Sequence, residues 1–259
     1  MTALEWIADN TISKIFALWP QPKPTIEKLK SVKLVAHRGV HENNLARENS
    51  MAAFQLALDH NIWAIELDIQ FTDDGVPVIN HDDHCTRLFN RPDIIIRKIK
   101  FKDLRHQLPE ILTLEEVIAK FGKKLHLMIE VKENLKYAPN KVKSLETLLS
   151  PLTPQSDYHL LSLTPEYLEP LFFAPKKALL DVIWLNPKDI FRENKKLGHG
   201  AIAGHFLFFT TPQISDLKAQ GKKIGAGFLN SRNSLYREVN RGIDYIFTDH
   251  PLTLKQYIP

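Results

Sequence analysis

Eight short apolar runs, separated by amphipathic stretches, constrain the fold of this chain more than any other feature. They are Val32–His37, Ala64–Phe71, Leu125–Val131, Tyr158–Ser162, Ala178–Trp184, Ala201–Phe208, Lys223–Leu229 and Asp244–Thr248. Strand-length runs that alternate with helical stretches are typical of a parallel α/β fold. Because eight parallel strands are the number that closes a (β/α)₈ barrel, we predict a TIM barrel.

A ninth run, Val76–Asn80, follows the second strand after only four turn residues, Thr72-Asp73-Asp74-Gly75. Parallel neighbours need a crossover of about a dozen residues or more, so this run cannot continue the parallel series. We predict instead that it is the return arm of a β-hairpin that ends at His81. Residues 86–112 show no regular period, and we predict a long loop near the site. The barrel therefore carries a hairpin and loop insertion after its second strand.

The first thirty residues form a separate unit in the predicted organisation, with the barrel spanning residues 31–259. Apolar residues recur there at helical spacing, namely Leu4, Ile7, Ile12, Ile15, Phe16 and Trp19. The proline-rich segment 20–24 then ends the helix. One interpretation places this helix against the bottom or flank of the barrel. The other is an interfacial membrane helix anchored by Trp6 and Trp19, although its polar face has little Lys or Arg.

The composition is that of an ordinary globular protein, with 44% hydrophobic and 25% charged residues. The net charge of +4 slightly favours an anionic ligand, but no basic run suggests nucleic acid. A single cysteine, Cys85, excludes an intramolecular disulfide and fits a reducing compartment. No stretch approaches the ~20 apolar residues of a membrane span, and the N-terminus lacks the features of a secretion signal. We expect a cytoplasmic protein, associated with membranes if its N-terminal helix lies on a bilayer.

Carboxylates stand at the ends of two predicted strands. Side chains alternate along a strand, so Glu66 and Asp68 share a face opposite their apolar neighbours. Glu130 and Lys132 repeat this arrangement on another strand. Ionised carboxylates are costly to bury without a partner, which suggests a bound cation. The alternative is a structural ion pair with an inward-facing Lys or Arg.

Three carboxylates would form a hard oxygen site. Such a site suits Mg²⁺ or Ca²⁺ better than zinc. We therefore predict one divalent cation held by Glu66, Asp68 and Glu130. Lys132 would supply a fixed positive charge for an anionic substrate.

Two histidines remain free for proton transfer. His37 ends the first strand, and Arg38 beside it offers a planar fork suited to phosphate. His81 ends the predicted hairpin, next to Asp82. Phosphodiester cleavage needs one group that removes a proton and another that protonates the leaving oxygen. We predict that His37 and His81 form this pair.

The other histidines and the cysteine carry weaker signals. His41 and His84 lie near the site in sequence, and we expect at most substrate contacts from them. His60, His106, His126 and His159 are expected on the surface or in packing, and His199 in a loop. Cys85 is expected to be a small buried residue.

Together these residues resemble the glycerophosphodiester phosphodiesterase family. The resemblance rests on His37-Arg38-Gly39, Glu48-Asn49-Ser50, Glu66-Leu67-Asp68, Thr72-Asp73-Asp74-Gly75, His81-Asp82, Glu130-Val131-Lys132, Gly242-Ile243-Asp244 and Thr248-Asp249-His250-Pro251. It implies a TIM barrel, a divalent metal on the three carboxylates and general acid–base catalysis by the two histidines. It also implies Arg38 and Lys132 as phosphate contacts, with glycerol 3-phosphate and an alcohol as products.

Two positions depart from the family pattern. Arg47 replaces the usual proline before Glu48-Asn49, and Phe228 stands where the late strand is commonly Trp-Thr-Val-Asn-like. Phe228 is predicted to form an apolar wall against the substrate. We predict a metal-dependent hydrolase of small-molecule glycerophosphodiesters. The alternatives are a lysophospholipase D-type activity at a membrane surface and a non-catalytic barrel that binds phosphorylated ligands.

Overall fold

The computed structural model describes residues 15–259, which form a closed barrel of eight parallel strands. The strands are β1 Lys33–Ala36, β2 Ala64–Phe71, β6 His126–Val131, β7 Tyr158–Ser162, β8 Leu179–Ile183, β9 Ala201–His205, β10 Lys223–Gly227 and β11 Tyr245–Thr248. Each pairs with the next in this order, and β1 closes the ring against both β2 and β11. The predicted TIM barrel is confirmed, with every strand inside or within a residue of its predicted range.

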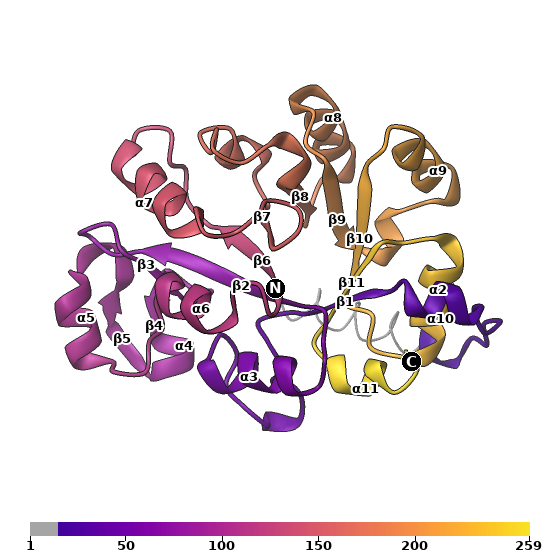
Figure 1. The fold of residues 1–259 in the computed structure, drawn as a ribbon, viewed down its shortest axis with the longest axis horizontal. Helices are drawn as coiled ribbons and strands as arrows, with labels where there is room; N and C mark the ends of the chain where they lie inside the picture. Colours follow the sequence, from indigo (N-terminus) through magenta and orange to yellow (C-terminus); the bar gives the residue numbers. More distant parts are fainter. Residues whose placement is uncertain (1–14) are drawn as a thin grey trace.

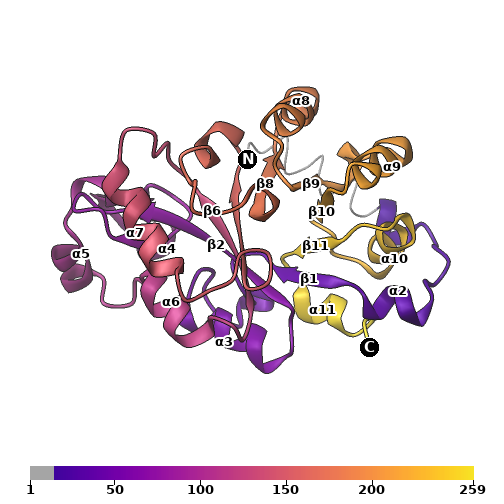
Figure 2. The same cartoon turned by 45° about the horizontal axis from the view of Figure 1, so that its top comes forward.

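Helices surround the ring of strands (Figures 1 and 2). They are α2 Ile26–Lys30, α3 Met51–Asp59, α6 Leu114–Phe121, α7 Pro139–Leu149, α8 Pro187–Leu197, α9 Thr211–Ala219, α10 Arg232–Arg241 and α11 Pro251–Lys255, with 3₁₀ turns η1 Glu42–Asn44, η3 Pro165–Leu168, η4 Lys176–Ala178 and η5 Phe206–Phe208. Local capping fixes where two of them begin. Ser50 accepts a hydrogen bond from the Ala53 amide at the start of α3, and Thr113 forms a capping box with Glu116 before α6.

Two apolar cores result from the alternation of side chains along the strands. Ile65, Leu67 and Ile69 of β2 point outward into the core beneath the helices. A smaller cluster that includes Val35, Met128 and Leu161 fills the barrel interior. The inward set of β2 therefore carries its carboxylates into the barrel above this inner core.

The predicted hairpin is present. Strand β3, Pro77–Ile79, pairs antiparallel with β2, with Ile79 opposite Ile69. Gly75 adopts a left-handed φ of 81° in the connecting turn. The hairpin therefore returns the chain along β2 and delivers His81 to the carboxyl ends of the barrel strands.

The prediction of a long loop over residues 86–112 is wrong. This segment contains α4 Thr86–Phe89, β5 Arg91–Ile95, η2 Ile96–Lys98 and α5 Phe101–Gln107, and β5 pairs with β4, His84–Cys85. These elements lie together beside β3 (Figure 1) and share a core with Cys85, Ile94 and Leu104. Each of these helices and strands is only a few residues long, too short for its hydrophobic residues to show a helical or strand period.

Only residues 15–19 of the predicted N-terminal helix lie within the described part, and residues 15–18 are helical. Phe16 contacts Phe206 edge-to-face at 5.0 Å, and the Asn233 side chain donates to the Ala17 carbonyl at 2.7 Å. Both partners follow the carboxyl ends of strands, so this segment packs near the upper flank and not on the bottom. Leu4, Trp6, Ile7 and Ile12 lie outside the described residues. No helix within residues 15–259 is long and apolar enough to span a bilayer.

Candidate active site

A pocket of about 980 Å³ lies at the carboxyl ends of the barrel strands. One half is lined by charged side chains from β1, β2, β6 and the segment after β3. The other half is lined by apolar side chains from β7 to β11. This end of a TIM barrel is where catalytic residues of the fold are found.

The three predicted metal ligands meet on the charged side. Glu66, Asp68 and Glu130 are buried, and each offers an oxygen within 4.8 Å of the others. The register explains this, because Asp68 of β2 stands directly opposite Glu130 of β6. Strand pairing thus assembles an oxygen cluster from residues far apart in sequence.

Two positively charged side chains contact this cluster. Lys132 Nζ lies 2.8 Å from Asp68 Oδ1 and 2.7 Å from Glu130 Oε1, and Arg38 Nε lies 3.4 Å from Asp68 Oδ2. Asn49 donates a further hydrogen bond to Asp68 Oδ2 at 2.8 Å. The inward-facing Lys and Arg of the ion-pair alternative are therefore present. They satisfy Asp68 most completely, since it receives both cations and the amide.

The remaining carboxylates are poorly compensated. Burial and the neighbouring Asp68 carboxylate raise the pKa of Glu66 to about 8. Burial also raises the pKa of Glu130. By contrast, Lys132 and Arg38 outweigh the effect of burial on Asp68 and hold its pKa well below the usual range. Glu66 is thus the ligand whose negative charge most needs a further cation.

A charge count over the whole cluster leads to the same conclusion. It contains six carboxylates, Glu48, Glu66, Asp68, Asp82, Glu130 and Asp249, and three permanently charged basic groups, Arg38, Arg87 and Lys132. With every carboxylate ionised and the histidines neutral, three negative charges would be in excess, and the raised pKa of Glu66 reflects this crowding of carboxylates. Such an excess would be costly in a buried site and would repel any anionic ligand. The residues present therefore fit a divalent cation with oxygen ligands.

His37 is held by a carboxylate from the other end of the chain. Its Nδ1 lies 2.7 Å from Asp249 Oδ1, and its Nε2 lies 3.9 Å from Glu66 Oε2. Burial opposes protonation of His37, but the hydrogen bond to Asp249 and the charge of Glu66 outweigh it and raise the pKa. The Asp249 contact orients the ring so that Nε2 faces the carboxylate cluster.

His81 has its own carboxylate, 2.8 Å from Nδ1, in the adjacent Asp82. Burial lowers the pKa of His81, and Lys132 and Arg38 reinforce this against the opposing Asp68. The two predicted acid–base residues therefore have the same arrangement, with Nδ1 on a carboxylate, but pKa values shifted in opposite directions. Such a division suits one proton donor and one acceptor.

Arg87, in α4, links the surroundings of the site. Its guanidinium donates to Glu48 through both Nη atoms at 2.8 Å and to Asp82 through Nε at 2.8 Å. Glu48 in turn accepts from Arg38 Nη1 at 3.0 Å. A series of ion pairs therefore connects Asp82, the carboxylate in contact with His81, with the guanidinium of Arg38, which is predicted to bind phosphate.

Backbone geometry positions the residues after β1. Arg38 has a φ of 56°, and its amide donates to Glu66 Oε2 at 3.0 Å. Gly39 has a φ of 83°, and a Cβ there would lie 2.8 Å from Ala53 Cβ. Only glycine fits this turn.

The remaining predicted residues fall into two groups. Phe228 lines the pocket with its ring edge-to-face to His37 at 5.7 Å, as expected of an apolar wall. His41 also lines it, with Nε2 3.6 Å from Asp249. Lys132 and His84 are not among the lining residues; Lys132 is turned onto the carboxylates.

Roles for Asp249, Asp82, Glu48 and Arg87 were missed, although the position of Asp249 directly after the last strand was a usable signal.

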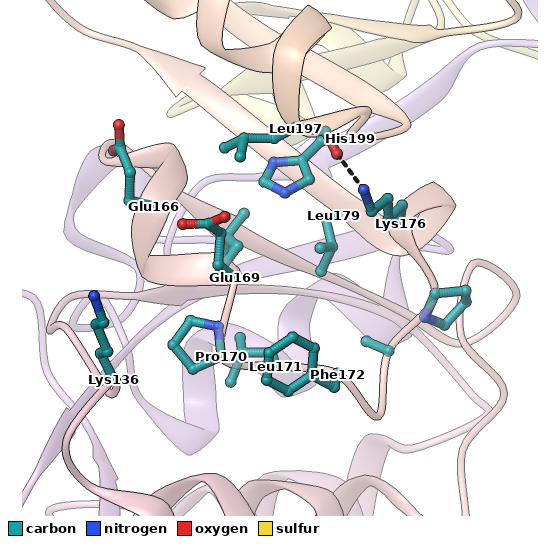
Figure 3. Close-up of a pocket in the computed structure, with 13 residues that line it drawn as sticks. Lys136, Glu166, Glu169, Pro170, Leu171, Phe172, Lys176, Leu179, Leu197 and His199 are labelled. Atoms are coloured by element: carbon teal, nitrogen blue, oxygen red, sulfur yellow. Dashed lines mark hydrogen bonds between the residues drawn. The ribbon is translucent and has the colours of Figure 1, made fainter.

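A second hollow of about 680 Å³ lies on the barrel flank, between η3, η4 and the end of α8 (Figure 3). His199 lies in the loop between α8 and β9, as expected, and reaches this hollow; its Nδ1 contacts the buried Asp181 at 2.8 Å. Lys176, also in this hollow, donates to the Leu197 carbonyl. Within residues 15–259, both groups able to hold a metal ion belong to the other pocket.

Comparison with known proteins decides the family. Residues 37–169, just over half of the chain, match the model of the glycerophosphoryl diester phosphodiesterase family. The chain belongs to this family of phosphodiesterases. The match includes both predicted histidines and all three predicted metal ligands, and the predicted family and enzyme class are confirmed.

Curated relatives and solved structures agree. The chain is 37% identical to a putative glycerophosphodiester phosphodiesterase, YhdW of Bacillus subtilis, over 38% of this chain and 44% of that protein. It is 27% identical to a glycerophosphodiester phosphodiesterase of Bacillus altitudinis over 85% of this chain and 95% of that one.

Among solved structures, a putative glycerophosphodiester phosphodiesterase of Galdieria sulphuraria superposes with a TM-score of 0.76 at 20% identity, over 87% of this chain and 97% of that one. An Oleispira antarctica phosphodiesterase in complex with the product sn-glycerol-3-phosphate superposes with a TM-score of 0.70 at 26% identity. It covers 87% of this chain and 96% of that one. The barrel is therefore that of the family.

Proposed function

We propose that this protein hydrolyses glycerophosphodiesters to glycerol 3-phosphate and an alcohol, using one divalent cation and two histidines. One observation carries the proposal. His37 and His81, each held by a carboxylate, line the same pocket as Glu66 and Glu130 of the buried carboxylate cluster. This pairing of proton-transfer groups with an oxygen-ligand cluster matches what phosphodiester cleavage requires.

The cation would be Mg²⁺ or Ca²⁺, with Glu66, Asp68 and Glu130 as its protein ligands. When bound, it would polarise the phosphoryl group and offset the charge of the transition state. The excess of negative charge and the raised pKa of Glu66 support this assignment. Lys132 contacts Asp68 and Glu130 and so favours the ionised form of both carboxylates.

The two histidines divide the proton transfers in this proposal. One accepts the proton of the attacking hydroxyl, and the other protonates the leaving oxygen. Asp249 and Asp82 fix Nδ1 of each ring, so that Nε2 is the atom that exchanges protons. Net hydrolysis consumes one water, breaks one phosphorus–oxygen ester bond and returns one proton to the alcohol.

Arg38 is proposed as the main phosphate contact. Its guanidinium lies between Glu48 and Asp68 and lines the pocket. Lys132 acts through the electrostatic field of the site, because its ammonium already contacts two carboxylates. The bound product in the Oleispira antarctica enzyme supports glycerol 3-phosphate as a product here.

A non-catalytic ligand-binding barrel is the competing class. It would not need two carboxylate-oriented histidines beside an uncompensated acidic cluster. The test is an assay of glycerophosphocholine, glycerophosphoethanolamine and glycerophosphoglycerol with added Mg²⁺ or Ca²⁺, reading glycerol 3-phosphate release. We expect release that chelation with EDTA abolishes. Binding without turnover across this panel would support the competing class.

A further inference from the structure

The apolar half of the active-site pocket is not explained by glycerol phosphate. It is formed mainly by side chains at the carboxyl ends of β7, β8, β10 and β11, namely Leu161, Leu163, Val182, Trp184, Phe228 and Phe247. We call these six residues the apolar wall. None of them is charged, whereas the acidic and permanently charged basic groups of the pocket lie on the opposite side or, for Asp249, just past β11. The pocket volume of about 980 Å³ is at the upper end of the ~300–1,000 Å³ typical of small-molecule sites.

The apolar wall reaches the reacting groups. Trp184 and Phe228 contact each other edge-to-face at 6.4 Å, and Phe228 contacts His37 in the same way at 5.7 Å. A phosphodiester placed against His37 would therefore have apolar surface immediately beside it. The wall is thus part of the site and not a separate patch.

Two glycines keep the wall open in its middle. Gly204 of β9 and Gly227 of β10 lie on neighbouring strands, and both line the pocket. A Cβ on Gly227 would meet only Gly204 O at 3.5 Å and Gly204 C at 3.8 Å, so packing does not require glycine there. At Gly204, by contrast, a Cβ would lie only 2.8 Å from Ile183 Cβ, so packing does require glycine there. The absence of a side chain at Gly227 therefore leaves space inside the pocket that the fold does not need.

Apolar side chains continue out of the pocket mouth. Leu163 is 37% exposed, Leu185 is 61% exposed and Leu207 is 40% exposed. Each lies within two residues of a wall or pocket residue on the same strand end, namely Leu161, Trp184 and His205. Exposed leucines therefore stand next to pocket residues at the ends of β7, β8 and β9.

Resting on the function proposed above, we propose that this site also takes, and prefers, glycerophosphodiesters that carry one long hydrocarbon chain, namely lysophospholipids. The chain lies along the apolar wall and passes over Gly227 towards Leu163, Leu185 and Leu207. Water then replaces the head-group alcohol on phosphorus. One ester bond breaks, the alcohol receives a proton, and the product is a lysophosphatidic acid.

The chemistry of the apolar wall favours a hydrocarbon chain over the quaternary ammonium of a choline head group. Aromatic sites for such cations are built from several ring faces, and only three of the six wall residues are aromatic. Aliphatic side chains also make up half of the wall. Burying apolar area favours binding by about fourfold for each methylene that leaves water.

The test compares glycerophosphocholine with lysophosphatidylcholines of increasing chain length, kept monomeric, in the presence of Mg²⁺ or Ca²⁺. The head group is the same throughout, so the ratio of kcat/KM values reports the effect of the acyl chain alone. We expect kcat/KM to rise with chain length until the wall is filled. Equal kcat/KM for all of them, or turnover of glycerophosphocholine alone, would overturn this inference while leaving the proposed function intact. Turnover of neither class would overturn both.

Three variants locate the effect. Gly227→Leu fills the open middle of the wall, and Trp184→Ala removes part of it. Each should lower the ratio of kcat/KM for long-chain lysophosphatidylcholine over glycerophosphocholine by tenfold or more, the loss expected from about two methylenes. Phe172→Ala is the control, since this 90% exposed aromatic lies in the flank hollow and should leave the ratio unchanged. An unchanged ratio in both Gly227→Leu and Trp184→Ala, each folded by circular dichroism, would contradict the chain path.

Discussion

Nδ1 of His37 lies 2.7 Å from Oδ1 of Asp249, although the two residues are 212 positions apart in the chain. The contact exists because β1 and β11 are neighbours in the closed ring, with Ala36 opposite Thr248. The residue after each strand end therefore meets the other across the mouth of the barrel. Closure of the barrel is thus a condition for orienting the histidine.

Replacing Asp249 by Asn tests that orientation. The amide keeps the size of the side chain but removes the charge that raises the pKa of His37. We expect the pKa of His37 to fall and kcat to drop by about 10²–10⁴, since proton transfer by a misplaced histidine is lost. NMR titration of the His37 ring and steady-state kinetics measure the two effects. An unaltered kcat together with a lowered pKa would argue against proton transfer by His37.

Arg87→Lys tests the series of ion pairs that begins at Asp82, the partner of His81. Lysine keeps the positive charge but cannot contact Glu48 through two atoms and Asp82 through a third at once. We expect kcat to fall about tenfold, the cost of one charge-assisted hydrogen bond, with little change in melting temperature because Arg87 is exposed. Arg91→Lys is the control, an arginine of the same insertion that pairs with the exposed Asp93. Equal losses in the two variants would point to a general effect on the insertion.

The carboxylate cluster predicts a stabilising effect of metal ions. We expect Mg²⁺ or Ca²⁺ to raise the melting temperature of the wild-type protein, because a ligand that binds only the folded state stabilises it. Glu130→Gln removes one proposed ligand and should lower metal affinity by about tenfold or more. Glu133→Gln is the matched control on the same segment, since Glu133 pairs with Lys141. If metal raises the melting temperatures of the Glu130→Gln and wild-type proteins equally, Glu130 is not a metal ligand.

A buried histidine pair at the other end of the barrel predicts acid sensitivity. His126 Nδ1 contacts the Ser156 carbonyl at 2.9 Å, and its Nε2 contacts His159 Nδ1 at 2.8 Å. Because the carbonyl can only accept, His126 Nδ1 carries a proton, and His159 Nδ1 must donate to His126 Nε2. The pair is therefore satisfied when both rings are neutral.

Burial lowers the pKa of His126 to about 4 and that of His159 to about 3. The unfolded chain, with an ordinary histidine pKa near 6.5, therefore binds protons before the folded protein does. Stability is retained above about pH 6.5 and falls as the pH drops towards 4, by up to about 1.4 kcal/mol per pH unit for each histidine. Urea unfolding at several pH values between these two limits measures how steeply the free energy of unfolding depends on pH. His126→Gln should reduce it, whereas replacing the exposed His60 by Gln should not.

Much of the barrel was predictable because its signals are local. The hairpin followed from the four-residue connection at Thr72–Gly75, and α3 and α6 begin at Ser50 and Thr113, where the capping residues stand. Glu66, Asp68 and Glu130 were found because each is a polar residue in an apolar strand. Alternation along a strand places such residues without any knowledge of the rest of the fold.

The contacts that complete the site were less accessible to sequence reasoning. Asp249 reaches His37 through barrel closure, and Arg87 reaches Glu48 across the insertion whose elements are too short to show a period. The apolar wall combines one or two residues from the ends of β7, β8, β10 and β11, none of which stands out in its own strand. These features depend on the positions of strands relative to one another, which sequence patterns alone do not specify.

The most direct test of the proposed chemistry follows glycerophosphocholine and a short-chain lysophosphatidylcholine by ³¹P NMR, with Mg²⁺ or Ca²⁺, for wild-type protein and for His37→Gln and His81→Gln. We predict conversion of at least one phosphodiester signal to a phosphomonoester signal by the wild type. Each histidine variant should convert it about 10²–10⁴ times more slowly while its melting temperature still rises with metal. Wild-type rates in either variant, or no conversion of either substrate by the wild type, would contradict the account.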